Sequence, residues 1–128
     1  MTEIQALLLI KSILESADIH GIENILAEDC EYMSTGRGII GRNRNETIEF
    51  LSSMAESIKA DNVPVTCKVM HIADVYEEDA LFHEGRHGLT VSYESGDNYV
   101  YMIFVDVNDE GLVDRIVSSQ ENYSIEYD

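Results

Sequence analysis

The sequence predicts an α+β fold in which three N-terminal helices pack on a curved, mostly antiparallel β-sheet. Apolar residues recur at helical spacing as far as about residue 62, and beyond Pro64 they alternate with a period of two. Pro64 stands where the period changes, and the residue before a proline disfavours helical geometry. At 128 residues the chain has the length of one domain, so we expect residues 1–128 to fold as a single unit.

The first two helices are expected before residue 30. Apolar residues at helical spacing run from Thr2 to Ala17, and Thr2 with Gln5 three residues later forms a capping-box pattern. Asp18 supplies a second cap signal. It predicts a short amphipathic helix over about residues 19–28.

The third helix is expected after a glycine-rich segment. Residues 30–34 should be extended, and residues 34–42 should form a turn-rich loop because they contain three glycines. Asn43 or Asn45 caps the helix that follows, and the sequence leaves both choices open. The helix should end near residues 61–62, because a proline follows shortly afterwards.

Four strands joined by hairpins are expected after the proline. They cover Val65–Ile72, Leu81–Tyr93, Asn98–Val107 and Leu112–Ser124. Glycines at positions 85 and 88 predict a bulge or a sharp bend in the second of these strands. The third strand is apolar on both faces, which predicts a central place in the sheet.

The charge balance restricts the possible partners. Eight basic residues against 25 acidic ones give a formal charge of −17, which repels nucleic acids and anionic membrane surfaces. The longest apolar run near the start, residues 6–10, is too short to span a bilayer and lacks the basic flank of a signal peptide, so we expect a cytoplasmic protein. Cys30 and Cys67 have no metal-ligand spacing and are expected to be free thiols. We expect no cofactor.

Three segments carry a resemblance to a known family. Asn24–Tyr32 resembles the exit from helix two into strand one of the nuclear transport factor 2-like superfamily, and residues 39–51 resemble its glycine turn into helix three. Residues 111–116 are similar to its closing strand. The resemblance covers essentially all of the chain and points to the cystatin-like cone shared by SnoaL-like proteins and ketosteroid isomerases. It implies a pocket between the helices and the concave face of the sheet, and homodimers formed through the convex face.

The resemblance does not extend to a catalytic residue. In ketosteroid isomerases a carboxylate base follows strand one, and Ser34, which carries no charge, holds that place here. Scytalone dehydratase-like members use paired histidines with a carboxylate and tyrosines, and this chain also has histidines on its predicted strands. The resemblance therefore implies a pocket without assigning catalytic residues.

The candidate pocket residues are two tyrosines and three histidines with polar groups on an otherwise apolar sheet. They are Tyr32, His71, His83, His87 and Tyr101. His83 and His87 lie about 13 Å apart on one strand face, which is too far for a shared ion, so we expect no metal site. His71 could approach the second-strand histidines across the ladder, where opposed residues are about 5 Å apart. Ordinary packing of the histidines and tyrosines in the sheet is the alternative.

We expect a domain that binds a small apolar or weakly acidic molecule. An isomerase-, lyase- or hydrolase-type activity on that molecule is one option. Arg37, Arg42 and Arg44 form a local basic patch that either steers anions or pairs with acidic residues of the third helix. A homodimer is expected through the exposed sheet face, because strand residues such as Met102 and Phe104 add apolar groups beyond one helix layer. The alternative function is a non-catalytic acidic protein, immunity- or inhibitor-like, that covers a basic partner.

Overall fold

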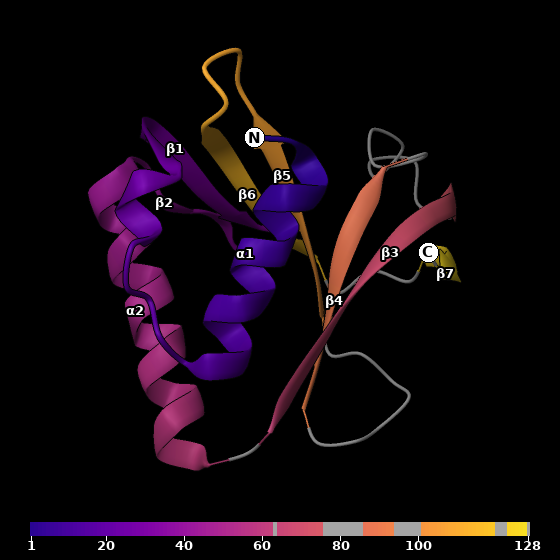
Figure 1. Cartoon of the computed structure of the whole chain (residues 1–128), viewed down its shortest axis with the longest axis horizontal. Helices are drawn as coiled ribbons and strands as arrows, with labels where there is room; N and C mark the ends of the chain where they lie inside the picture. Colours follow the sequence, from indigo (N-terminus) through magenta and orange to yellow (C-terminus); the bar gives the residue numbers. More distant parts are fainter. Residues whose placement is uncertain (63, 76–85, 94–100, 120–122, 128) are drawn as a thin grey trace.

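The structure is a computed structural model that describes residues 1–62, 64–75, 86–93, 101–119 and 123–127. For the strand residues 72–75, 93 and 123–127 it describes the backbone alone. Helices form one layer and a curved sheet forms the other, as Figure 1 shows. This is the α+β architecture that the change of period predicts.

The first and the last of the predicted helices are confirmed. Helix α1 (Glu3–Ser16) begins at the capping box, in which the Thr2 hydroxyl accepts from Gln5 N and the Gln5 side chain accepts from Thr2 N. Helix α2 (Arg44–Asp61) begins at Asn43, whose side-chain oxygen accepts from the backbone N–H of Glu46 at 2.9 Å. The structure thereby selects Asn43 over Asn45 as the N-cap.

The predicted helix over residues 19–28 is wrong. Only a three-residue 3₁₀ turn, η1 (Ile22–Asn24), forms there, and strand β1 (Leu26–Ser34) begins inside the expected helix. The backbone N–H of Val113 donates to the carbonyl of Ile25 at 2.8 Å. Strand β1 then pairs in parallel with the strand that begins at Val113. Strand pairing with a segment distant in sequence therefore overrides the local helical spacing.

In the described ranges the sheet contains seven strands, in the order β2-β1-β6-β5-β4-β3-β7. Besides β1, they are β2 (Gly38–Gly41), β3 (Val65–Val75), β4 (His87–Tyr93), β5 (Tyr101–Val107), β6 (Val113–Ser119) and β7 (Tyr123–Tyr127). The β1–β6 pair is parallel and all other pairs are antiparallel. The predicted succession of antiparallel neighbours from β3 to β6 is confirmed, and β5 lies at the centre of the order.

Two boundaries differ from the prediction because of strand pairing at the sheet edges. The predicted loop over residues 34–42 contains β2, which forms a hairpin with β1. The predicted last strand is two strands: β6 pairs with β5, whereas β7 pairs with β3 at the opposite edge of the sheet. Each short strand thus gives hydrogen-bond partners to an edge that would otherwise be open.

Of the bulge or bend expected at Gly85 and Gly88, the structure shows no bulge at Gly88, and Gly85 lies outside the described residues. The β3–β4 register is regular from the pair Val65 and Tyr93 to the pair His71 and His87. Gly88 instead allows a close approach, since a Cβ atom built there would lie 2.9 Å from a ring carbon of Phe104.

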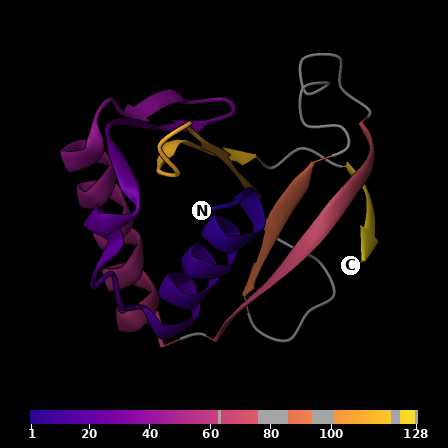
Figure 2. The same ribbon diagram turned by 45° about the horizontal axis from the view of Figure 1, so that its top comes forward.

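The main core lies between the helices and one face of the sheet. Helix α1 packs on β3, β4 and β5, and α2 packs on β1 and β2 (Figure 2). Buried apolar side chains of α1 meet the alternate residues of the central strands that point toward it. They include Leu7, Ile10, Leu14, Leu89, Val91, Ile103 and Val105.

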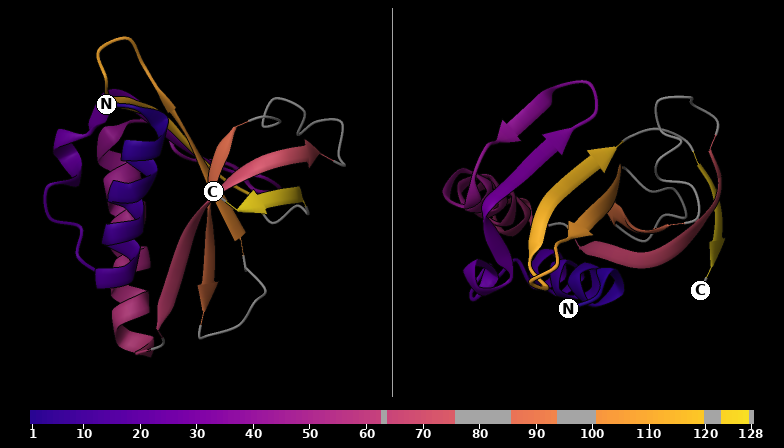
Figure 3. Two further views of the ribbon diagram at one scale, coloured as in Figure 1. Left: turned by 45° about the vertical axis from the view of Figure 1, so that its right-hand side comes forward. Right: turned by 90° about the horizontal axis from the view of Figure 1, so that it is seen from above.

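The other face of the central strands is buried as well. Met70, Met102, Phe104 and Val117 are each 4% exposed or less within the single chain. The view from above in Figure 3 shows β3 and β7 curling round relative to β5 and β6. Met102 and Phe104, which the sequence places on the face expected to form the dimer, are already covered by the chain itself, and the homodimer stays a prediction.

None of the helices in the described ranges combines the length and the apolar character needed to cross a lipid bilayer.

Candidate functional site

A cavity of about 530 Å³ lies between α2, the β1–β2 hairpin and the strands β5 and β6. Apolar and aromatic side chains alternate with hydroxyl groups in its lining. The described lining consists of Tyr32, Ser34, Thr35, Gly36, Arg37, Ile40, Phe50, Met54, Tyr101 and Ser118.

An aromatic pair forms one wall of the cavity. Tyr32 of β1 is 1% exposed, and its ring centroid lies 4.6 Å from that of Phe50 on α2, with the planes tilted by 47°. Met54 follows Phe50 by four residues and therefore stands on the same face of the helix. This wall gives an apolar molecule a surface on which to pack.

Hydroxyl groups reach the cavity from three neighbouring strands. Ser34 and Ser118 are paired residues of the parallel β1–β6 ladder, and Ser118 is paired in turn with Ile103 of β5. Tyr101 precedes Ile103 by two residues, so the three hydroxyl-bearing side chains share the face that the helices cover. Thr35 N donates to the carbonyl of Ser118 at 3.0 Å and fixes the hairpin turn beside them.

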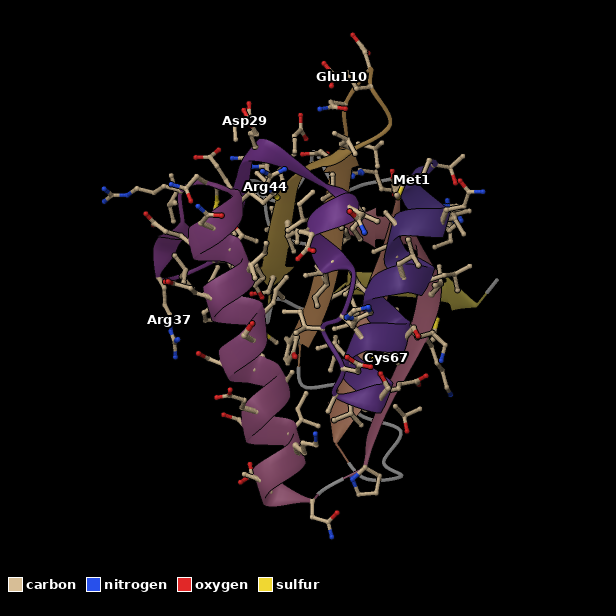
Figure 4. The ribbon with its side chains drawn as sticks, turned by 60° about the vertical axis from the view of Figure 1, so that its left-hand side comes forward. Met1, Asp29, Arg37, Arg44, Cys67 and Glu110 are labelled. Atoms are coloured by element: carbon tan, nitrogen blue, oxygen red, sulfur yellow. The ribbon has the colours of Figure 1, made fainter. Side chains whose placement is uncertain are left out.

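Arg37 supplies the charge at the mouth of the cavity. It is exposed in the turn between β1 and β2 and is labelled in Figure 4. Within the part of the chain that the structure describes, Arg37 forms no ion pair, and the cavity lining has no carboxylate, imidazole or thiol. Of the predicted basic patch, Arg42 and Arg44 do not line the cavity, and the backbone N–H of Arg42 donates to Glu46.

The structure divides the predicted site residues into two groups. Tyr32 and Tyr101 line the cavity, whereas His71 and His87 lie outside its lining. His83 falls outside the described residues. Ser34, at the place where the resemblance puts a carboxylate base, does line the cavity and brings a hydroxyl there instead.

His71 and His87 form a pair of their own. They are directly opposed in the β3–β4 ladder, and their ring centroids are 5.4 Å apart with the planes at 63°. The backbone N–H of His87 donates to Glu3 Oε1 at 3.0 Å, which ties this rung to the first turn of α1. The predicted approach of His71 to a second-strand histidine is therefore confirmed for His87.

Cys30 and Cys67 are buried free thiols, as expected. Burial, with a smaller contribution from nearby carboxylates such as Asp114 at Cys30 and Glu15 at Cys67, raises the pKa of each thiol to about 12. A neutral thiol is a poor nucleophile, so both residues act as small core side chains. Among the described residues, no three His, Cys, Asp or Glu side chains are grouped to hold a metal ion.

Phe50, Met54 and Ser118 were not among the predicted site residues. The periodicity assigns Met54 to the core face of its helix, which is also the face that borders the cavity. Ser118 follows Ile116 at strand spacing on a core face, and a hydroxyl at such a position is the signal that could have found it.

The comparison with known proteins rests on structure. The sequence matches no protein-family model and no curated protein. An LEH-like epoxide hydrolase from M. tuberculosis is similar with a TM-score of 0.58 and 18% identity, over 93% of this chain and 78% of that chain. A putative ketosteroid isomerase from Kribbella flavida gives a TM-score of 0.55 and 18% identity, over 98% of this chain and 81% of that one.

An NTF2-like protein of unknown function from Cytophaga hutchinsonii has a TM-score of 0.54 and 12% identity, over 92% of this chain and 98% of that one. These likenesses span nearly the whole described architecture, and they concern the fold. The chain therefore shares the fold of these structures.

Proposed function

We propose that this chain binds a small, largely apolar molecule in the cavity between α2 and the β1–β2 hairpin. The observation that carries the proposal is the cavity itself, whose volume of about 530 Å³ falls within the range of ligand pockets. Its lining joins an aromatic and aliphatic wall to a few polar groups, which is the composition that orients an apolar ligand by one end.

The polar groups indicate a weakly acidic head group. The hydroxyls of Ser34, Ser118 and Tyr101 can donate to a carboxylate or a carbonyl oxygen, and Arg37 adds a positive charge at the mouth. In a chain of formal charge −17, a cation beside the cavity is a local exception that favours an anionic ligand there.

Binding without turnover is the function that the described lining supports best. The similar structures include one called an epoxide hydrolase and one called a putative ketosteroid isomerase. Isomerase, lyase or hydrolase chemistry of the acid–base kind needs a proton-transfer group near pH 7. Hydroxyls and a guanidinium, the polar groups of the described lining, do not provide one.

The test compares decanoate with decanol by isothermal titration on the full chain. Met54→Trp places a larger ring in the cavity, and Ser57→Trp adds the same ring at an exposed position of α2. We expect Met54→Trp to weaken decanoate binding by at least about tenfold and Ser57→Trp to leave it unchanged. Equal affinities in the two variants would contradict the cavity as the binding site.

A second candidate function, an acidic protein that covers a basic partner, is favoured by one group of carboxylates. Burial raises the pKa of Asp114 above its ordinary value, and the nearby charges of Asp106 and Asp29 raise it further. Asp29 and Glu110 lie at the same end of the molecule (Figure 4). Mutual repulsion of this kind would be relieved by a cationic partner.

Binding of a lysine-rich peptide at low and at moderate salt tests this candidate. Asp29→Asn with Asp114→Asn removes two carboxylates of this group, and Glu49→Gln with Glu56→Gln removes two exposed charges from α2. If these carboxylates form a binding surface for the peptide, the first double variant should lose more affinity than the second. Equal losses would show that only the net charge matters.

A further inference from the structure

We propose that His71 and His87 form a binding site for a divalent transition-metal ion, for which Zn²⁺ is the natural probe. Imidazole nitrogens are good ligands for zinc, copper and nickel ions. Neither histidine lines the cavity, so this site is separate from the proposed ligand pocket. The approach of His71 to a second-strand histidine is expected from the strand pattern, and the structure adds that its partner is His87, directly opposite on the neighbouring strand.

The distance between the two rings matches a shared ion. Zinc lies about 2.1 Å from a histidine nitrogen, so the ring centroid is about 3.2 Å from the metal. Two rings on one tetrahedral ion then have centroids about 5.2 Å apart. The centroids of His71 and His87 are 5.4 Å apart with the planes at 63°, so the rings already have the spacing of two ligands on one ion, and binding requires side-chain rotation to aim a nitrogen of each at it.

The strand pairing holds the two ligands in place. His71 and His87 are opposed residues of a regular antiparallel register, in which the two side chains point to the same side of the sheet. Glu3 accepts from the backbone N–H of His87 and also forms an ion pair with Arg86 at 3.4 Å. The opposed pair His71 and His87 is thus fixed to α1 before any ion binds. Ion binding therefore does not have to order either backbone.

The site is open to ions and lies in a favourable field. Both histidines are half-buried, so water and ions reach the rings while part of each ring is shielded. The formal charge of −17 raises the concentration of cations near the surface. Water completes the coordination of a two-histidine site, as it does at open zinc positions.

Zinc titration of the full, untagged chain tests the proposal. Excess Mg²⁺ is present to occupy carboxylate oxygens, which this hard cation prefers. Loss of even an outer partner of a metal ligand costs about 10- to 100-fold in affinity, so His71→Ala and His87→Ala should each weaken binding at least about tenfold. The control is His20→Ala, which removes an exposed histidine before η1 and should leave the affinity unchanged.

A second measurement does not depend on the folding of variants. In the wild-type chain, Zn²⁺ should shift the imidazole nitrogen resonances of His71 and His87 together at one equivalent and leave those of His20 in place. Unchanged resonances of the pair, or equal zinc affinities in His71→Ala, His87→Ala and wild type, would overturn the proposal. Neither result would affect decanoate binding in the cavity, which is tested separately.

Discussion

At position 88 of β4 only a hydrogen atom fits on the face that carries Phe104 and Met102. A Cβ atom there would lie 2.9 Å from Phe104 Cε1 and 3.2 Å from Met102 Cγ. The neighbouring side chains are themselves buried, so they have little room to move. Gly88 is therefore needed for the packing on this face rather than for a bulge.

We predict that Gly88→Ala destabilises the fold by about 1–3 kcal/mol, because an extra methyl group overpacks a closed face. Urea denaturation measures the change. Phe104→Leu in the same chain should recover part of the loss by making room. An unchanged denaturation midpoint in Gly88→Ala would contradict the close packing.

Thr47 joins α2 to β1 through one buried hydrogen bond. Its hydroxyl is completely buried and donates to the carbonyl of Cys30 at 3.0 Å. Thr47→Val keeps the shape but leaves that carbonyl without this donor, and should cost about 1–3 kcal/mol of unfolding free energy. Thr47→Ser, which keeps the hydroxyl, is the control and should lose less. Equal effects of the two substitutions in thermal and urea unfolding would show that the hydroxyl is not the cause.

At the scale of elements, the N-cap of α2 separates two residues that the sequence could not separate. Asn43 accepts from Glu46 N, while Asn45 is an exposed residue inside the first turn. Asn43→Ala should therefore destabilise the fold by about 1 kcal/mol, and Asn45→Ala should change stability little. The urea midpoints of the two variants measure this difference. A larger loss of stability in Asn45→Ala than in Asn43→Ala would contradict Asn43 as the N-cap.

Helix α1 is fixed to the start of β3 by a charged pair. Glu15 accepts from the backbone N–H of Cys67 at 3.0 Å, and Lys11 donates both to Glu15 and to the carbonyl of Cys67. Burial pushes the pKa of Glu15 upward, but the bonds from Lys11 and Cys67 outweigh it and hold the pKa below its ordinary value. The folded state therefore favours the ionised form.

The lowered pKa of Glu15 predicts how the stability of the fold changes as the pH falls. A lowered pKa adds stability above the ordinary value of 4.5, and that stability is lost as the pH falls through the lower folded value. Glu15→Gln should reduce stability at neutral pH and flatten its decline in acid. Glu56→Gln, at an exposed position of α2, is the control. Parallel stability curves for Glu15→Gln and wild type in urea titrations from neutral to acidic pH would contradict the role of Glu15.

At the scale of the whole molecule, the curled sheet buries apolar side chains that the sequence assigns to a dimer interface. Met102 and Phe104 are buried within one chain, whereas the large exposed apolar side chains in the described ranges include Ile4, Leu8 and Leu9 of α1. An apolar strip of this kind often marks an interface. We keep the prediction of a homodimer.

Light scattering at micromolar concentration should give twice the chain mass of 14.4 kDa. The predicted interface is the exposed sheet face, so Leu8→Glu, in the exposed strip of α1, should leave the dimer mass unchanged. A monomer mass for the wild-type chain would contradict the dimer.

Local patterns predicted much of the architecture because they reflect local interactions. The capping box at Thr2 and Gln5 joins groups three residues apart, and it appears in the structure as the sequence indicates. The end of α2 before Pro64 and the period of two in β3 likewise depend on neighbours along the chain. The prediction of a helix over residues 19–28 is wrong because a helical spacing of apolar residues also fits a turn followed by a strand.

The candidate site could be predicted only in part. Tyr32 and Tyr101 were identified as polar groups on an apolar sheet, and both line the cavity. Phe50 and Met54 were missed as site residues because a helix face that borders a cavity has the same periodicity as one that borders a core. His71 and His87 were grouped with the tyrosines because strand parity gives the face of a residue and not its position along the sheet.

By itself, the sequence determined the capping box of the first helix, the change from helical to strand periodicity and the acidic charge, since each follows from residues close in the chain or from composition. Only the tertiary structure decided that β1 begins at Leu26, that β7 pairs with β3, and that His71 stands opposite His87. These features depend on which distant strands pair and in which register. A register shift of one residue would turn every side chain of a strand to the other face, and no local pattern contains that information.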